Sequence, residues 1–167
     1  MAVRRLETSG PSETESLGAE LASRLTDGDL VLIRGELGSG KTTLVRGAAR
    51  ALGVQDPVTS PTFSIGHRYR AGELTVSHLD LYRLGGLGGE DPDLLADYLG
   101  PGRIAFVEWP EQGDPELAGA RMLVTLSHGG GDRRLLEIEE RMPAGAGGGS
   151  SWCAGWTTRT PRTSPCA

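Results

Sequence analysis

The segment Gly35-Glu36-Leu37-Gly38-Ser39-Gly40-Lys41-Thr42 has the residue types and spacing of a phosphate-binding loop, G-x-x-x-x-G-K-[ST]. Its glycines let the main chain wrap a phosphate chain with successive N–H groups pointing inward. In this chemistry Lys41 reaches the β- and γ-phosphates, and the Thr42 hydroxyl is placed to ligate Mg²⁺. Lys41 is the only lysine of the chain, as expected where a compact ammonium cannot be replaced by the fork of arginine. The segment predicts a nucleotide site, the alternative being an ordinary glycine-rich turn.

Two acids, Glu108 and Asp80, each end a segment with the pattern of a strand. Ile104-Ala105-Phe106-Val107-Glu108 has the form of a buried strand that ends in a carboxylate, and ligands bind at the carboxyl ends of strands in open α/β sheets. Glu108 would hold Mg²⁺ directly, hold it through water, or orient the attacking water, the alternative being a solvated glutamate at a strand end. Asp80 would bind the water shell of the metal or polarise the nucleophilic water, the alternative being an aspartate that caps the local backbone or forms an ion pair with Arg83.

Two further features are open to more than one interpretation. His78 stands near a predicted strand end without a second histidine at a metal-ligand spacing, so we expect a hydrogen-bonded structural residue. Val58-Thr59-Ser60-Pro61-Thr62-Phe63 has hydroxyls around a proline. This pattern suits a loop that closes over a γ-phosphate and equally suits a plain polar turn.

The hydrophobic pattern predicts the elements that must position these residues. Ser12-Glu13-Thr14-Glu15 predicts a helix start with Ser12 as N-cap. The apolar run 30–33 predicts a strand buried on both faces before the loop, and residues 41–52 predict the helix after it. The remaining pattern predicts hairpins around 71–73 and 129–132 and a short helix that opens at Asp91-Pro92. We therefore expect an α/β, P-loop NTPase-like three-layer fold, with a mostly parallel central sheet and antiparallel hairpin additions.

Length and charge narrow the class of protein. The 167 residues amount to about one domain, and a composition change predicts a P-loop ATPase domain in 1–142 and a flexible Gly/Ser/Thr/Pro-rich tail in 143–167. The net charge of −5 gives no basis for direct DNA contact. No apolar run reaches the roughly 18 residues of a membrane span, and residues 1–7 lack a signal-peptide core, so we expect a cytoplasmic protein without a membrane partner.

Four sequence blocks occur in a specific order along the chain. They are Gly35–Leu44, Ser60-Pro61-Thr62-Phe63, His78-Leu79-Asp80-Leu81-Tyr82-Arg83 and Val107-Glu108-Trp109-Pro110-Glu111. The second and third blocks are not general features of P-loops. In this order and spacing, over about residues 6–140, the chain resembles the TsaE (YjeE) family, small ATPases of bacterial tRNA threonylcarbamoyladenosine synthesis. One departure is Ser39, where the family often has alanine.

The resemblance implies ATP as the nucleotide, Mg²⁺ as the metal, and slow hydrolysis by the isolated protein. It also implies TsaB and TsaD as partner subunits, with tRNA contacted indirectly through that complex and TsaD carrying the transfer. Trp109 would lie next to the nucleotide. Taken with the loop motif, the implied site residues are Lys41, Asp80 and Glu108 for catalysis, Thr42 and Glu108 for Mg²⁺, and Gly38, Ser39, Gly40, Lys41, Thr42, Thr43 and Arg134 for the nucleotide.

Two other functions stay open on the residues alone. One is a small-molecule P-loop kinase, which would need an acceptor pocket and an arginine-bearing lid. The other is a non-enzymatic switch, in which ATP occupancy alone alters partner binding. The chain has no guanine-reading N-K-x-D motif, which favours ATP over GTP.

Overall fold

The computed structural model describes residues 2–62, 64–82, 95–110, 117 and 119–141. Within these residues a mixed α/β fold surrounds the phosphate-binding loop. Its elements are β1 (Ala2–Thr8), α1 (Pro11–Ala22), β2 (Leu30–Gly35), α2 (Lys41–Ala51), β3 (Gly66–Ala71), β4 (Leu74–Asp80), β5 (Arg103–Glu108), β6 (Met122–His128) and β7 (Arg134–Glu140). The predicted tail, and with it the domain boundary at residue 142, lies outside the described residues.

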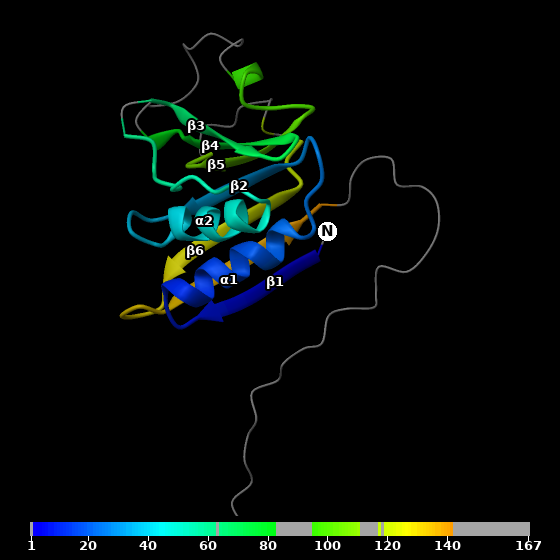
Figure 1. Cartoon of the computed structure of the whole chain (residues 1–167). Helices are drawn as coiled ribbons and strands as arrows, with labels where there is room; N and C mark the ends of the chain where they lie inside the picture. The colour runs from blue at the N-terminus through cyan, green and yellow to red at the C-terminus, as the bar shows by residue number, and fades with distance from the viewer. Residues whose placement is uncertain (1, 63, 83–94, 111–116, 118, 142–167) are drawn as a thin grey trace, which may run out of the picture.

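The strands of the described chain form a single sheet in the order β1-β7-β6-β2-β5-β4-β3 (Figure 1). The four central strands β6, β2, β5 and β4 run parallel to one another. The outer strands β3, β7 and β1 add to this centre in antiparallel pairs. Both predicted hairpins are confirmed, as β3–β4 and β6–β7, and the parallel centre with antiparallel additions is confirmed with them.

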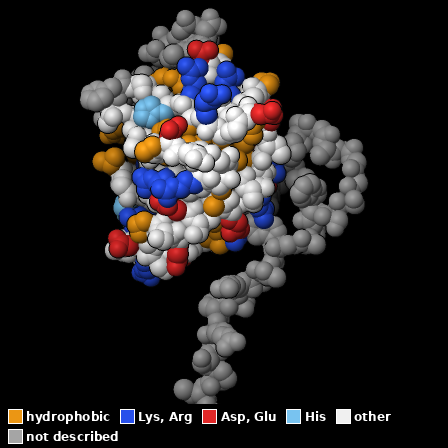
Figure 2. Space-filling view, viewed as in Figure 1, with side chains coloured by type: hydrophobic (Ala, Val, Ile, Leu, Met, Phe, Trp, Pro, Cys, Tyr) orange, Lys and Arg blue, Asp and Glu red, His pale blue; other side chains and the backbone are white. Residues whose placement is uncertain are grey.

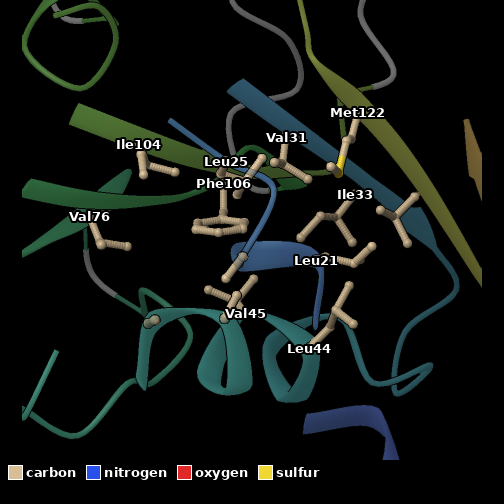
Figure 3. Close-up of a cluster of buried hydrophobic side chains, with 14 of the residues drawn as sticks. Leu21, Leu25, Val31, Ile33, Leu44, Val45, Val76, Ile104, Phe106 and Met122 are labelled. Atoms are coloured by element: carbon tan, nitrogen blue, oxygen red, sulfur yellow. The ribbon is translucent and has the colours of Figure 1, made fainter. Parts of the chain in front are cut away.

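One face of the sheet is covered by both α1 and α2 (Figure 1). Alternate residues of β2 divide between the faces: Val31 and Ile33 belong to the core under the helices, whereas Leu30 belongs to the core on the other face. Figure 3 shows Leu44 and Val45 of α2 pointing into the core under the helices. The prediction that residues 30–33 form a strand buried on both faces is confirmed.

The opposite face packs against two short segments. Leu95 from one segment and Leu117 and Ala120 from the other join Leu79 and Val107 of the sheet in a second buried cluster. The predicted short helix opens at 91–92, outside the described residues, and its described end is helical only at residues 95–96. The three-layer arrangement therefore stays a prediction. No helix of the described chain combines the length and the apolar character needed to cross a bilayer.

The predicted start of the first helix is wrong. The N-cap is Gly10, in extended backbone, and Pro11 occupies the first turn, so Ser12 lies inside the helix. Proline favours this start because its φ angle is already helical and its missing N–H would have no partner there. Glu13 supplies the side-chain hydrogen bond at the helix start, because its Oε2 accepts from the Ser9 amide at 2.7 Å.

The helices α1 and α2 approach each other through glycine. A Cβ atom on Gly47 would lie 1.9 Å from the carbonyl oxygen of Glu15, and one on Gly18 would meet the main chain of α2 at 2.1 Å. Glu15 also pairs with Arg50 at 2.9 Å and with Arg46 at 3.3 Å across this contact. Figure 2 shows basic and acidic side chains side by side on this face. The close contact fixes α2, whose first turn carries Lys41 and Thr42, against the rest of the fold.

Candidate nucleotide site

The loop between β2 and α2 has backbone angles that glycine permits. Gly35, Gly38 and Gly40 have φ angles of +151°, +74° and +97°, a region that other L-residues rarely adopt. A Cβ atom on Gly35 would lie 2.5 Å from the carbonyl oxygen of Leu126 in β6, whereas one on Gly38 would meet no atom of the described chain within 4 Å. The loop is therefore packed against β6 at Gly35, whereas no atom of the described chain would contact a Cβ atom at Gly38.

The side chain of Lys41 is buried and folds back over this loop. Its Nζ donates to the carbonyl oxygens of Gly35 at 2.9 Å and Glu36 at 3.0 Å, and lies 4.1 Å from the centroid of the Trp109 ring. Burial lowers the pKa of Lys41 below its ordinary value, and two nearby carboxylates oppose this shift. The ammonium is thus held at the loop by neutral acceptors, which an anion can replace.

Trp109 lies beside Lys41 in an unusual backbone conformation. Its φ of +61° makes it the one non-glycine residue with a positive φ in the described chain. Its amide donates to the carbonyl oxygen of Ile33 at 3.1 Å, which ties it to the end of β2. Its ring packs at a tilt on Tyr82, with 4.8 Å between centroids, and Tyr82 is 59% exposed. This geometry places an aromatic pair next to the loop.

Glu108 at the end of β5 is the point where the loop meets the sheet. Its carboxylate is buried, and Oε1 accepts two hydrogen bonds, from the Thr42 hydroxyl at 2.9 Å and from Nε2 of His78 at 2.8 Å. The contact with Thr42 brings together the two residues predicted to serve Mg²⁺. The contact with His78 is one that the sequence reasoning missed. The available signal was its position two residues before Asp80 on the same strand, because residues two apart share a face.

Asp80 lies next to Glu108, because the two residues are register partners in the parallel pair β4–β5. The Oδ2 atom of Asp80 accepts a hydrogen bond from the Ser60 hydroxyl at 3.0 Å, and Oδ1 accepts one from the Tyr82 amide at 3.1 Å. Ser60 thus joins the polar segment before β3 to the site. The bond from the Tyr82 amide is the local capping contact that was one alternative for Asp80. The other alternative partner, Arg83, lies outside the described residues, as does Phe63.

Two residues implied by the resemblance lie at the edges of the loop. Arg134, at the start of β7, donates through Nη2 to the carbonyl oxygen of Gly38 at 3.4 Å. Thr43 lies in the first turn of α2. The structure therefore brings the final hairpin and the start of α2 to the same loop.

The residues present fit a bound phosphate chain. The N–H groups in the first turn of α2 have no acceptor within the helix, and the helix dipole favours an anion at this end. The hydroxyl of Ser39 is buried and has no hydrogen-bond partner in the described chain.

The residues at the loop also fit Mg²⁺, which takes one or two protein oxygens and completes its coordination shell with phosphate and water oxygens. Thr42 and Glu108 supply such oxygens side by side. In the described chain no group of three or more His, Cys, Asp or Glu side chains could hold a metal ion.

Comparison with known proteins assigns the family. The family model described as "Threonylcarbamoyl adenosine biosynthesis protein TsaE" matches residues 8–136. The chain belongs to the TsaE family. The resemblance inferred from four sequence blocks is thereby confirmed.

Two TsaE relatives and one solved structure show the extent of the similarity. The chain is 40% identical over 109 residues to the "tRNA threonylcarbamoyladenosine biosynthesis protein TsaE" of Synechocystis sp., which covers 59% of this chain and 65% of that protein. It is 34% identical over 130 residues to the protein of the same name from Bacillus subtilis, covering 77% and 80%. The crystal structure of B. subtilis YdiB matches with a TM-score of 0.65 and 29% identity over 82% of this chain and 84% of YdiB. The chain thus spans just under two thirds of the Synechocystis protein and shares the α/β fold of YdiB.

Proposed function

We propose that this chain is a Mg²⁺-dependent subunit that binds and hydrolyses ATP and is required for threonylcarbamoyladenosine modification of tRNA, acting in the cytoplasm with TsaB and TsaD. The pathway is supported by relatives that carry the name tRNA threonylcarbamoyladenosine biosynthesis protein TsaE. The nucleotide chemistry is supported above all by the hydrogen bond between Thr42 and Glu108, at 2.9 Å. This bond joins the phosphate-binding loop to the carboxylate at the end of β5.

In the proposed site the loop binds the phosphates. The first-turn N–H groups of α2 donate to phosphate oxygens, and Lys41 exchanges the carbonyls of Gly35 and Glu36 for the β- and γ-phosphates. The exchange is favourable because a phosphate oxygen carries a full charge and a carbonyl does not. Arg134, which donates to the carbonyl oxygen of Gly38 at 3.4 Å, lies beside the loop as a further cation for the nucleotide phosphates.

Glu108 and Asp80 have different roles in the proposed site. Thr42 and Glu108 would hold Mg²⁺, which supplies charge neutralisation on the phosphate oxygens when it is bound. Asp80 orients the attacking water, because its two oxygens are fixed by Ser60 and by the Tyr82 amide at the neighbouring strand end. The proposed residues position the reactants and neutralise charge, and none of them is proposed to form a covalent intermediate. These roles suit phosphoryl transfer to water.

The test is nucleotide binding and phosphate release by the purified full chain. We expect a non-hydrolysable ATP analogue to bind more tightly with Mg²⁺ than with EDTA in calorimetry. We also expect free phosphate to appear from ATP, slowly for the chain alone and faster when TsaB and TsaD are added. Absence of nucleotide binding would overturn the proposal. Phosphate found on an added metabolite instead of in solution would point to the kinase alternative.

The switch alternative makes a different prediction for Asp80. An Asp80→Asn chain keeps the size of the side chain and is expected to bind ATP but not to hydrolyse it. Under the proposed function this variant fails to support modification over many turnovers in a reconstituted reaction. If it supports modification as well as the unaltered chain does, occupancy alone is sufficient and the switch is the better description.

A further inference from the structure

His78 is a fully buried polar side chain on β4, between β3 and β5. Its exposed fraction is 0%, and it lies on β4, directly beside β5 (Figure 1). Its Nε2 lies 2.8 Å from Oε1 of Glu108, whereas its Nδ1 is buried and has no hydrogen-bond partner in the described chain. A buried polar group costs free energy unless its bond to a partner offsets the loss of water. The contact with Glu108 is the feature that can offset this cost.

The position of the proton on His78 follows from these contacts. A carboxylate oxygen only accepts hydrogen bonds, so the 2.8 Å contact requires the proton on Nε2. A proton on Nδ1 would be a buried donor without an acceptor in the described chain. His78 therefore donates from Nε2 to Glu108.

The two donors to Glu108 differ in what holds them. Thr42 lies in the first turn of α2, directly after the loop, and its hydroxyl oxygen is also the proposed metal ligand. His78 belongs to a strand whose register against β5 is continuous from Thr75 to Asp80. The donor on β4 is thus fixed by the sheet, whatever the loop binds.

We propose that His78 is a positioning residue, which holds the carboxylate of Glu108 in the orientation that serves Mg²⁺ in the site. The proposal rests on the proposed function, because it assumes a nucleotide and its metal at the loop. His78 acts through Glu108 alone. Groups that orient a metal ligand in this way typically change metal affinity by about 10- to 100-fold when they are removed.

Two amide substitutions give a matched test of this role. In His78→Gln the side-chain nitrogen lies the same number of bonds from Cβ as Nε2 of histidine, so an N–H donor toward Glu108 is retained. In His78→Asn the nitrogen corresponds to Nδ1 and falls short of Glu108. His78→Leu removes the donor and keeps a buried side chain of similar size. His67→Leu serves as the control, because His67 is the cross-strand partner of His78 on β3 and bonds Tyr69 at 3.0 Å.

The measured quantity is the Mg²⁺ gain, defined as the affinity for a non-hydrolysable ATP analogue in Mg²⁺ divided by the affinity in EDTA, both from calorimetry on the full chain. We expect His78→Leu and His78→Asn to lose about tenfold of this gain while their affinity in EDTA stays within about twofold of the unaltered chain. His78→Gln should keep most of the gain, and His67→Leu all of it. In a Glu108→Gln background, His78→Leu should cause no further loss, because the residue it positions is already changed.

The outcomes separate this inference from the proposed function. If the unaltered chain shows no Mg²⁺ gain, both fail. If the unaltered chain shows a gain and His78→Asn and His78→Leu retain it, the positioning role is wrong and the proposed function stands. The same conclusion follows if the His78 substitutions reduce the gain as much in the Glu108→Gln background as in the unaltered chain. Melting temperatures identify variants that do not fold, and if His78→Leu is one of them the comparison of Gln with Asn decides.

Discussion

The ammonium group of Lys41 lies 4.1 Å from the centroid of the Trp109 ring and donates to the carbonyl oxygens of Gly35 and Glu36 at 2.9 and 3.0 Å. The Lys41 ammonium group therefore contacts both the indole ring and the loop. A cation so close to an indole face interacts with the electrons of the ring. Any ligand that draws Lys41 away changes the environment of Trp109.

This relationship predicts that nucleotide binding changes the fluorescence of Trp109. The chain has three tryptophans, and the other two lie in residues 143–167. Titration with an ATP analogue should change the emission of the unaltered chain. In Trp109→Phe the change should disappear although calorimetry still detects binding. An equal emission change in Trp109→Phe would show that the signal comes from elsewhere.

Substitution of Lys41 should weaken nucleotide binding strongly. Lys41→Ala removes charge-assisted hydrogen bonds to phosphate, each worth about 1.5–3 kcal/mol, so affinity should fall about 10- to 100-fold in calorimetry. Lys41→Arg should also fail, because the planar guanidinium is broader than the ammonium that the loop carbonyls enclose. Normal ATP hydrolysis by Lys41→Arg would contradict this account of the loop.

The lowered pKa of Lys41 predicts a pH dependence of binding. Burial lowers this pKa in the free protein, whereas a bound phosphate raises it by favouring the charged form. At a pH between the pKa of Lys41 in the free protein and its pKa in the complex, binding takes up a proton. The affinity for the nucleotide therefore falls as the pH rises, and this fall begins below the ordinary lysine pKa. Calorimetry in two buffers of different ionisation enthalpy, repeated at several pH values below the ordinary lysine pKa, measures the uptake. Equal heats in both buffers would mean that Lys41 is already charged in the free protein.

Local sequence signals were sufficient for the loop and its flanking elements. The strand over 30–33 and the helix from Lys41 depend on neighbours within a few positions, and both are confirmed. The phosphate-binding role of the motif residues stays a prediction. The helix ends shortly before Gly53, whose φ of +102° suits glycine. The parallel centre of the sheet then placed the strand ends of Asp80 and Glu108 next to each other, as the rule for α/β sheets predicts.

Contacts between distant segments could not be predicted in this way. The strand β1 was not predicted, because its sequence is highly charged and its stability depends on β7. The Arg5 side chain, for example, donates to Glu137 at 2.6 Å across a sequence separation of 132 residues. The contact of His78 with Glu108 was missed for the same reason, since it depends on the register between two strands. The alternation of residues places His78 on the same side of its strand as Asp80, but which side chain of β5 it meets depends on the register of the folded sheet.

Removal of residues 143–167 should leave nucleotide binding unchanged. The family match ends at residue 136, and the segment beyond 142 has a composition that cannot bury a core. A chain ending at residue 142 should bind the ATP analogue within about twofold of the full chain and melt at a similar temperature. A large loss of affinity or of solubility would show that the segment contributes to the domain.

The glycine contact between α1 and α2 predicts a large loss of stability for Gly47→Ala. The added Cβ would lie 1.9 Å from the carbonyl oxygen of Glu15, and main-chain atoms of two packed helices cannot move aside as a flexible side chain would. Overpacking of this kind costs about 1–3 kcal/mol, and the contact with main chain puts Gly47→Ala at about 3 kcal/mol in chemical denaturation. Gly119→Ala is the matched control, because no atom of the described chain lies within 4 Å of a Cβ at that position. Equal stability of the two variants would mean that the helices can separate freely. In that case α2, and the loop residues that begin it, would not be held in place by α1.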